Sequence, residues 1–153
     1  FKTLRLLQHE DVAQAGKYSH VISALQEIAE SVRDMILRCH VHTSNKHAGL
    51  LPAQKKELQK IRKCVEALLD DTARILLSHE AFKYREVAAH YVKLKELLEE
   101  YDDNQIGRIR SGESKTRLSI LFYGINNACL KISEQALMLL TIFDETFHLE
   151  ENP

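Results

Sequence analysis

The sequence is poor in glycine, proline and aromatic residues. Its 153 residues include only 5 glycines and 2 prolines, and no tryptophan, so glycine and proline together stay far below the roughly 12% of average proteins. Strand-rich folds use both residues at their many turns, whereas helix interiors avoid them. The composition therefore favours an all-helical chain, and the length favours a single domain.

Paired cysteines, long apolar runs and net charge are also missing. The three cysteines, Cys39, Cys64 and Cys129, form no CxxC pair, which argues against a zinc knuckle or a secreted disulfide framework and favours a reducing compartment. No apolar run approaches the roughly 18 residues of a membrane span, and no signal peptide is visible. Because 21 basic residues nearly balance 22 acidic ones, only a local patch can attract a charged partner.

Apolar residues recur at helical spacing along four segments, and these residues are the predicted core. The first segment contains Val12, Ala15, Val21, Leu25, Ile28, Val32, Met35, Ile36 and Cys39. The second contains Leu58, Ile61, Val65, Leu68, Thr72 and Ile75. The third contains Phe82, Val87, Tyr91, Leu94, Leu98, Tyr101 and Ile106, and the fourth Leu118, Leu121, Phe122, Ile125, Cys129, Ile132, Ala136, Leu139 and Phe143.

Three breaks separate the segments. The first is a polar connection over residues 40–51, followed by Pro52 at a helix start. The second is a turn near residues 78–81, and the third is Ser111-Gly112, with Gly112 as a left-handed cap. The fold is therefore predicted to be all-α, an up-down-up-down antiparallel bundle of about four long helices, with residues 1–153 as one domain. Because the chain begins with Phe1, we expect it to be a piece of a longer protein.

Basic residues concentrate in two segments that such a bundle brings together. Residues 38–63 hold seven basic residues and one acid, and residues 108–117 hold four basic residues and one acid. Both segments fall at the same end of an up-down bundle, so we predict a basic end that meets an anionic partner; a merely solvated charged surface is the alternative. The candidate residues are Lys46, Lys55, Lys56, Lys60, Arg108, Arg110, Lys115 and Arg117.

No constellation in the sequence predicts catalysis or a metal site. A di-iron bundle needs Glu-x-x-His on two helices, but the pattern occurs once, at Glu145 and His148. His40, His42 and His47 cluster in the predicted first connection, without the further ligands of a zinc site. We predict a non-enzymatic protein with no catalytic residue, metal ligand or cofactor. Nucleic acid is not an expected partner, because aromatic residues do not interleave with the basic ones.

Three runs together resemble a known family. They read YSHVISALQEIAES at residues 18–31, NKHAGLLPAQ at 45–54 and RIRSGESKTRLSILFY at 108–123. In this order and at these spacings, they resemble the cytosolic C-terminal domain of bacterial (Bacteroidetes-type) sodium/phosphate cotransporter-related proteins. That domain is similar to PhoU, the helical regulator of phosphate uptake. The resemblance covers nearly the whole chain and implies a PhoU-like bundle.

The resemblance implies a function and a setting. It implies a cytosolic regulatory or interaction domain of a sodium-dependent phosphate cotransporter-like protein, at the cytoplasmic face of the inner membrane. The implied partner is the membrane-embedded transporter domain of the same chain. The charge of the basic end adds anionic lipid or an acidic face of the transporter as the expected anionic partner. Phe1 enters at the opposite end of the bundle, so a second copy is the alternative partner of the basic end. The alternative is a free-standing PhoU-type phosphate-signalling adaptor that binds metal.

One feature of PhoU proteins does not transfer to this chain. PhoU proteins bind metal through an acid-x-x-x-Asp motif. The analogous segment at residues 123–127 reads YGINN, and Glu27 is followed by Ser31 at i+4. The resemblance therefore carries no metal ligand across.

Overall fold

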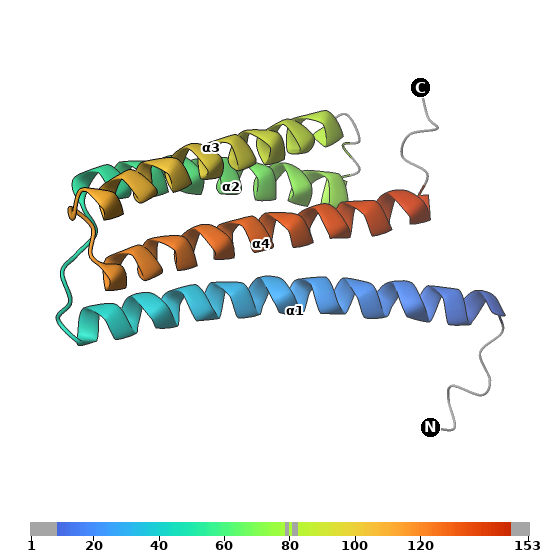
Figure 1. Ribbon diagram of the computed structural model, residues 1–153. Coiled ribbons are helices and arrows are strands. Elements are labelled where there is room, and N and C mark those ends of the chain that lie inside the picture. The colour runs from blue at the N-terminus through green and yellow to red at the C-terminus, as the bar shows by residue number, and fades with distance from the viewer. Residues whose placement is uncertain (1–8, 79, 81–82, 148–153) are drawn as a thin grey trace.

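The chain forms four long helices in the computed structural model, which describes residues 9–78, 80 and 83–147 (Figure 1). The helices are α1 (His9–Ser44), α2 (Pro52–Ser78), α3 (Tyr84–Arg110) and α4 (Thr116–Phe147). Successive helices run in opposite directions, and the described residues include no strand. The predicted all-α, antiparallel bundle is confirmed. None of the described helices combines the length and the hydrophobicity of a membrane span.

The helix boundaries follow from local sequence. Pro52 begins α2, where its fixed φ suits the first helical position. The N–H of Leu51 donates to Oε1 of Gln54 at 2.9 Å, which is one half of a capping box. Gly112, after the end of α3, has φ 75°, the left-handed conformation expected of a cap glycine. The predicted turn near residues 78–81 also agrees with the end of α2 and the start of α3.

The first connection is shorter than predicted. Helix α1 continues through His40 and His42 to Ser44, so the prediction that these histidines lie in a loop is wrong. The helix ends where the N–H of Lys46 donates to the carbonyl of Thr43 at 2.9 Å and that of His47 to the carbonyl of His42 at 3.2 Å. This pair of bonds is a Schellman motif. The largely polar residues 40–44 can continue the helix because its backbone hydrogen bonds form without an apolar face.

The core lies among α2, α3 and α4, which form a three-helix unit. One cluster includes Ile61, Leu94 and Phe122, and a second includes Leu68 and Leu140; all of these side chains are fully buried. The predicted stripes of α2 and α4 are confirmed as core, since their members are buried or half-buried. The third stripe is confirmed from Val87 to Tyr101 and wrong at Ile106, which is exposed.

Helix α1 lies on the outside of this unit and packs extensively against α4 alone (Figure 1). Its side facing α4 includes the buried Ala24 and the half-buried Ile28 and Met35. Leu25, Val32 and Ile36 were predicted to be core and are exposed. The prediction is wrong there because α1 has two neighbouring apolar faces and α4 covers one of them. Ala15 is exposed too. The side chains of Val12, Phe82, Glu145 and His148 lie outside the described residues.

Candidate anionic-partner surface

The two connections at one end of the bundle bring the predicted basic residues together (Figure 1). The α1–α2 connection, the α3–α4 connection and the flanking helix ends all lie at this end. Seven of the eight candidate residues are exposed on it, and we call these seven the basic end. They are Lys46, Lys55, Lys56, Lys60, Arg110, Lys115 and Arg117.

Arg108 is the exception, because its side chain points inward and is only 9% exposed. Its guanidinium donates to both carboxylate oxygens of Glu57, at 3.0 and 2.7 Å, and lies 5.3 Å from the ring centre of Phe122. A bidentate pair of this kind uses up the donors that an external anion would need. Arg108 therefore does not belong to the surface for which it was predicted; it holds α3 to α2.

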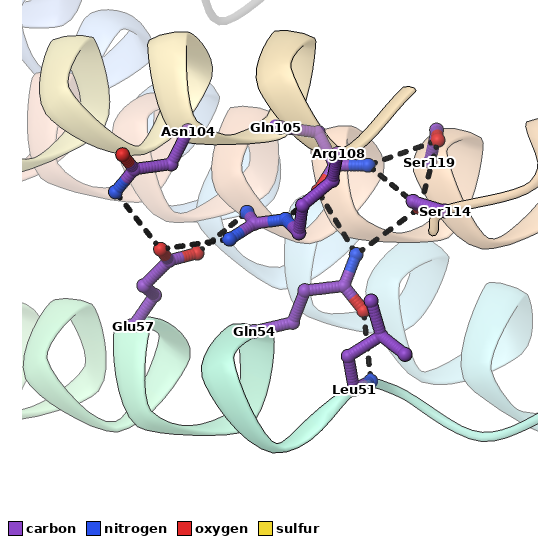
Figure 2. Close-up of polar contacts among 8 residues, drawn as sticks. All are labelled: Leu51, Gln54, Glu57, Asn104, Gln105, Arg108, Ser114 and Ser119. Carbon is purple, nitrogen blue, oxygen red and sulfur yellow. Dashed lines mark hydrogen bonds and ion pairs between the residues drawn. The ribbon is translucent and has the colours of Figure 1, made fainter. Parts of the chain in front are cut away.

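A buried polar network anchors the basic end (Figure 2). Gln54 on α2 donates to Gln105 on α3 at 2.9 Å. Gln105 in turn donates to the hydroxyls of Ser114 and Ser119, at 2.8 and 2.9 Å. The network joins two helices to the start of α4 and to the loop before it, and so fixes the positions from which the exposed basic side chains project.

Sequence reasoning missed this network, although the spacing holds a signal for it. Gln105 and Arg108 continue the buried series of Leu94, Leu98 and Tyr101 in alternating steps of four and three residues. Gln54 and Glu57 precede Ile61 at the same spacing on α2. Polar residues in register with an apolar stripe are expected to be buried and paired.

A hollow of about 570 Å³ lies between the two connections. Its lining includes Lys46, His47, Lys115 and Arg117, with Glu113 as the one acid. Nη1 of Arg117 lies 3.4 Å from Nδ1 of His47. Removal from solvent, and next the nearby Arg117 and His42, lower the pKa of His47. His47 is therefore neutral at pH 7, and its Nδ1 can accept from the guanidinium.

Backbone amides add to the positive character of this hollow. The first intrahelical bond of α4 runs from the N–H of Ser119 to the carbonyl of Lys115 at 3.0 Å. The amides of Thr116, Arg117 and Leu118 precede that bond and have no i−4 carbonyl within the helix, and such amides favour anions. The C-termini of α1 and α3 lie at the same end and oppose this dipole. Charged side chains therefore supply most of the attraction.

The backbone at Lys46 is held in an unfavourable conformation. Its φ is 53°, in the left-handed region that costs a non-glycine residue of order 1 kcal/mol. The equivalent position after α3 holds Gly112, with φ 75°. Both helices are thus followed by a residue in the left-handed conformation, and only one of these residues is glycine. A lysine in the other places a positive charge beside the hollow despite the backbone cost.

The histidines and cysteines have other surroundings. His42 is buried, and its Nε2 lies 2.8 Å from the carbonyl oxygen of Ala48. No group of three His, Cys, Asp or Glu residues suited to a metal ion occurs in the described part of the chain. The cysteines are free, and burial raises the pKa of Cys129 to about 11. Its thiol is therefore protonated at neutral pH and is a poor nucleophile.

No family model, curated protein or solved structure matches this chain. The resemblance to PhoU-like domains therefore depends on the three sequence runs alone.

Proposed function

We propose that this chain is a non-enzymatic regulatory or interaction domain of a sodium-dependent phosphate cotransporter-like protein. In this proposal, the basic end binds the anionic cytoplasmic leaflet beside the transporter. One observation carries it: two of the three runs that resemble the family, residues 45–54 and 108–123, meet at the basic end and both contribute residues to the lining of the same hollow. Four of the seven residues of the basic end, Lys46, Arg110, Lys115 and Arg117, belong to these two runs.

The charge at this end fits a membrane surface better than a small buried ligand. The seven basic side chains are exposed and spread over both connections and the first turns of α2. An anionic leaflet attracts each nearby lysine or arginine by about 1 kcal/mol. An array of exposed cations therefore binds a surface strongly, although each contact alone is weak.

The first experiment is co-sedimentation with vesicles of phosphatidylserine and phosphatidylcholine. We expect the wild-type chain to bind at low salt and to be released at high salt, because exposed charges are screened. A fourfold charge reversal of the basic end should weaken binding by roughly a thousandfold, because the loss of four cations removes about 1 kcal/mol each. The reversed residues are Lys55, Lys56, Arg110 and Arg117, each changed to Glu.

A matched control variant changes the net charge of the chain by the same amount, but at positions outside the basic end. It reverses four exposed basic residues away from the basic end, namely Arg74, Arg85, Lys93 and Lys95. This control should keep most of the binding if position decides affinity. Equal losses in the two variants would show a general charge effect, and no binding of the wild type at low salt would rule out the membrane-facing proposal.

A further inference from the structure

Helix α1 carries a second apolar face that no described helix covers. Its residues follow one another in steps of 4, 3, 4, 3 and 4, the spacing of a coiled-coil seam. Every member is exposed, with Ile22 at 64% and Ile36 at 61%. We call this face the α1 stripe. It consists of Tyr18, Ile22, Leu25, Ala29, Val32 and Ile36.

The stripe contains a shaped hollow. A depression of about 620 Å³ lies along α1 and is lined by Ala29, Val32, Arg33 and Ile36, together with Leu37 and His40. The first four occupy positions i, i+3, i+4 and i+7, which are the four positions that receive one knob in a coiled coil. Ala29 is the small member, so it leaves room for a side chain of a facing helix.

We propose that a second copy of this chain covers the α1 stripe, with the two α1 helices antiparallel and Ala29 close to the two-fold axis. The stripe is self-complementary about Ala29. With that residue on the axis, Leu25 of one copy lies level with Arg33 of the other and beside Val32, and Ile22 lies level with Ile36. Each Leu25 then enters the hollow of the opposite helix, as a two-fold interface requires of both partners.

Charge decides the direction of the two helices. Ser44, the last residue of α1, lies at the basic end. A parallel pair would place two basic ends side by side, and such like-charge contacts cost several kcal/mol. An antiparallel pair places each basic end beside the opposite end of the other copy. In the antiparallel pair, Arg33 of one copy also lies near Gln26 of the other. The side-chain amide of Gln26 donates to Glu30 of its own helix at 3.0 Å.

The size of the stripe fits a stable pair. Side chains that are about half exposed, spread over roughly 27 Å of helix, present on the order of 500 Å² of apolar surface, as much as the largest patches that monomers leave open. The flanking Leu37, which is also exposed, brings the area to roughly 600 Å², the lower limit of what each partner contributes to a stable interface.

Sedimentation velocity across the micromolar range tests the association. We expect the wild-type chain to form a dimer, and Ala29→Glu to raise the dissociation constant by about a hundredfold or more, because two like charges meet on the axis. Ala29 is exposed, so this variant should keep the helical content of the wild type, and Ile36→Gln provides a second test. Val92→Glu, at an exposed apolar position on α3, is the control that should leave the dimer intact. A monomeric wild type, or a dimer unaffected by Ala29→Glu, would overturn the proposal.

Disulfide trapping tests the direction. In a Cys39→Ser background, a mixture of Ile22→Cys and Ile36→Cys chains should form a mixed disulfide, since antiparallel helices bring these positions within bonding distance. Ile22→Cys chains alone should not cross-link. Efficient cross-linking of Ile22→Cys with itself would show a parallel pair and contradict the arrangement.

Discussion

Replacing Glu57 with alanine should destabilise the fold by about 3–5 kcal/mol, the range for removing one partner of a buried ion pair. Glu57 and Arg108 are nearly buried, with side chains 11% and 9% exposed. Without the carboxylate, the guanidinium keeps its bond to Gln105 and loses both partners for its terminal nitrogens. Asn104 loses its acceptor too, since it donates to Glu57 at 3.0 Å. Urea unfolding followed by circular dichroism measures the loss.

Two comparisons separate the buried pair from a general effect of charge. Glu66→Ala, on the same helix, removes an exposed carboxylate 3.4 Å from Arg62 and should cost less than about 1 kcal/mol. The double variant Glu57→Leu with Arg108→Met should be more stable than Glu57→Ala, because no buried charge is left alone. A loss for Glu57→Ala as small as that for Glu66→Ala would show that the ion pair does not hold α2 to α3.

Replacing Leu68 with alanine should cost about 2–5 kcal/mol, the range for truncating a buried leucine. Leu68 is 0% exposed and packs in one cluster with Ile75, Val87, Ala136 and Leu140. These residues come from α2, α3 and α4, so the cavity would lie where all three helices meet. Thermal or urea unfolding gives the change in the free energy of unfolding.

Leu77 provides the matched control, since it lies on the same helix and is 83% exposed. The same substitution there should change stability by less than about 0.5 kcal/mol. A loss below that value for Leu68→Ala would mean that α2 turns a different face to the core.

The helices and most of their ends could be predicted from the sequence because local chemistry determines them. Pro52 starts α2 and Gly112 adopts the left-handed conformation after α3, both as predicted. Each residue acts through its own backbone, so no knowledge of the tertiary structure is needed. The end of α1 was missed for the opposite reason. It depends on the left-handed conformation of Lys46, and the presence of a lysine does not predict that conformation.

The role of α1 could not be predicted from periodicity. An apolar stripe shows that a helix has a face to cover, but not which element covers it. Leu25 and Ile36 satisfy the same spacing rule as Leu68 and Ile75, yet the first two are exposed and the last two are buried. The buried side of α1 instead includes Ser31 and His42, which a hydrophobic pattern does not select.

The sequence predicted which segments form the basic end, but not which of their basic side chains are exposed. Topology alone brings residues 38–63 and 108–117 together, and the structure shows this arrangement. Whether each cation faces outward depends on its partners. Arg108 and Arg110 differ by two positions, which is about 200° around a helix. The first therefore meets Glu57 and the second is exposed.

Hydrogen–deuterium exchange with and without phosphatidylserine vesicles shows whether the basic end is the surface that binds an anionic membrane. Bound vesicles should slow exchange in residues 45–51 and 111–115, the two connections beside the hollow. Exchange in the middle of α3 should not change. Slowed exchange confined to other parts of the chain, or no change in the two connections under conditions where the chain sediments with the vesicles, would contradict binding through the basic end.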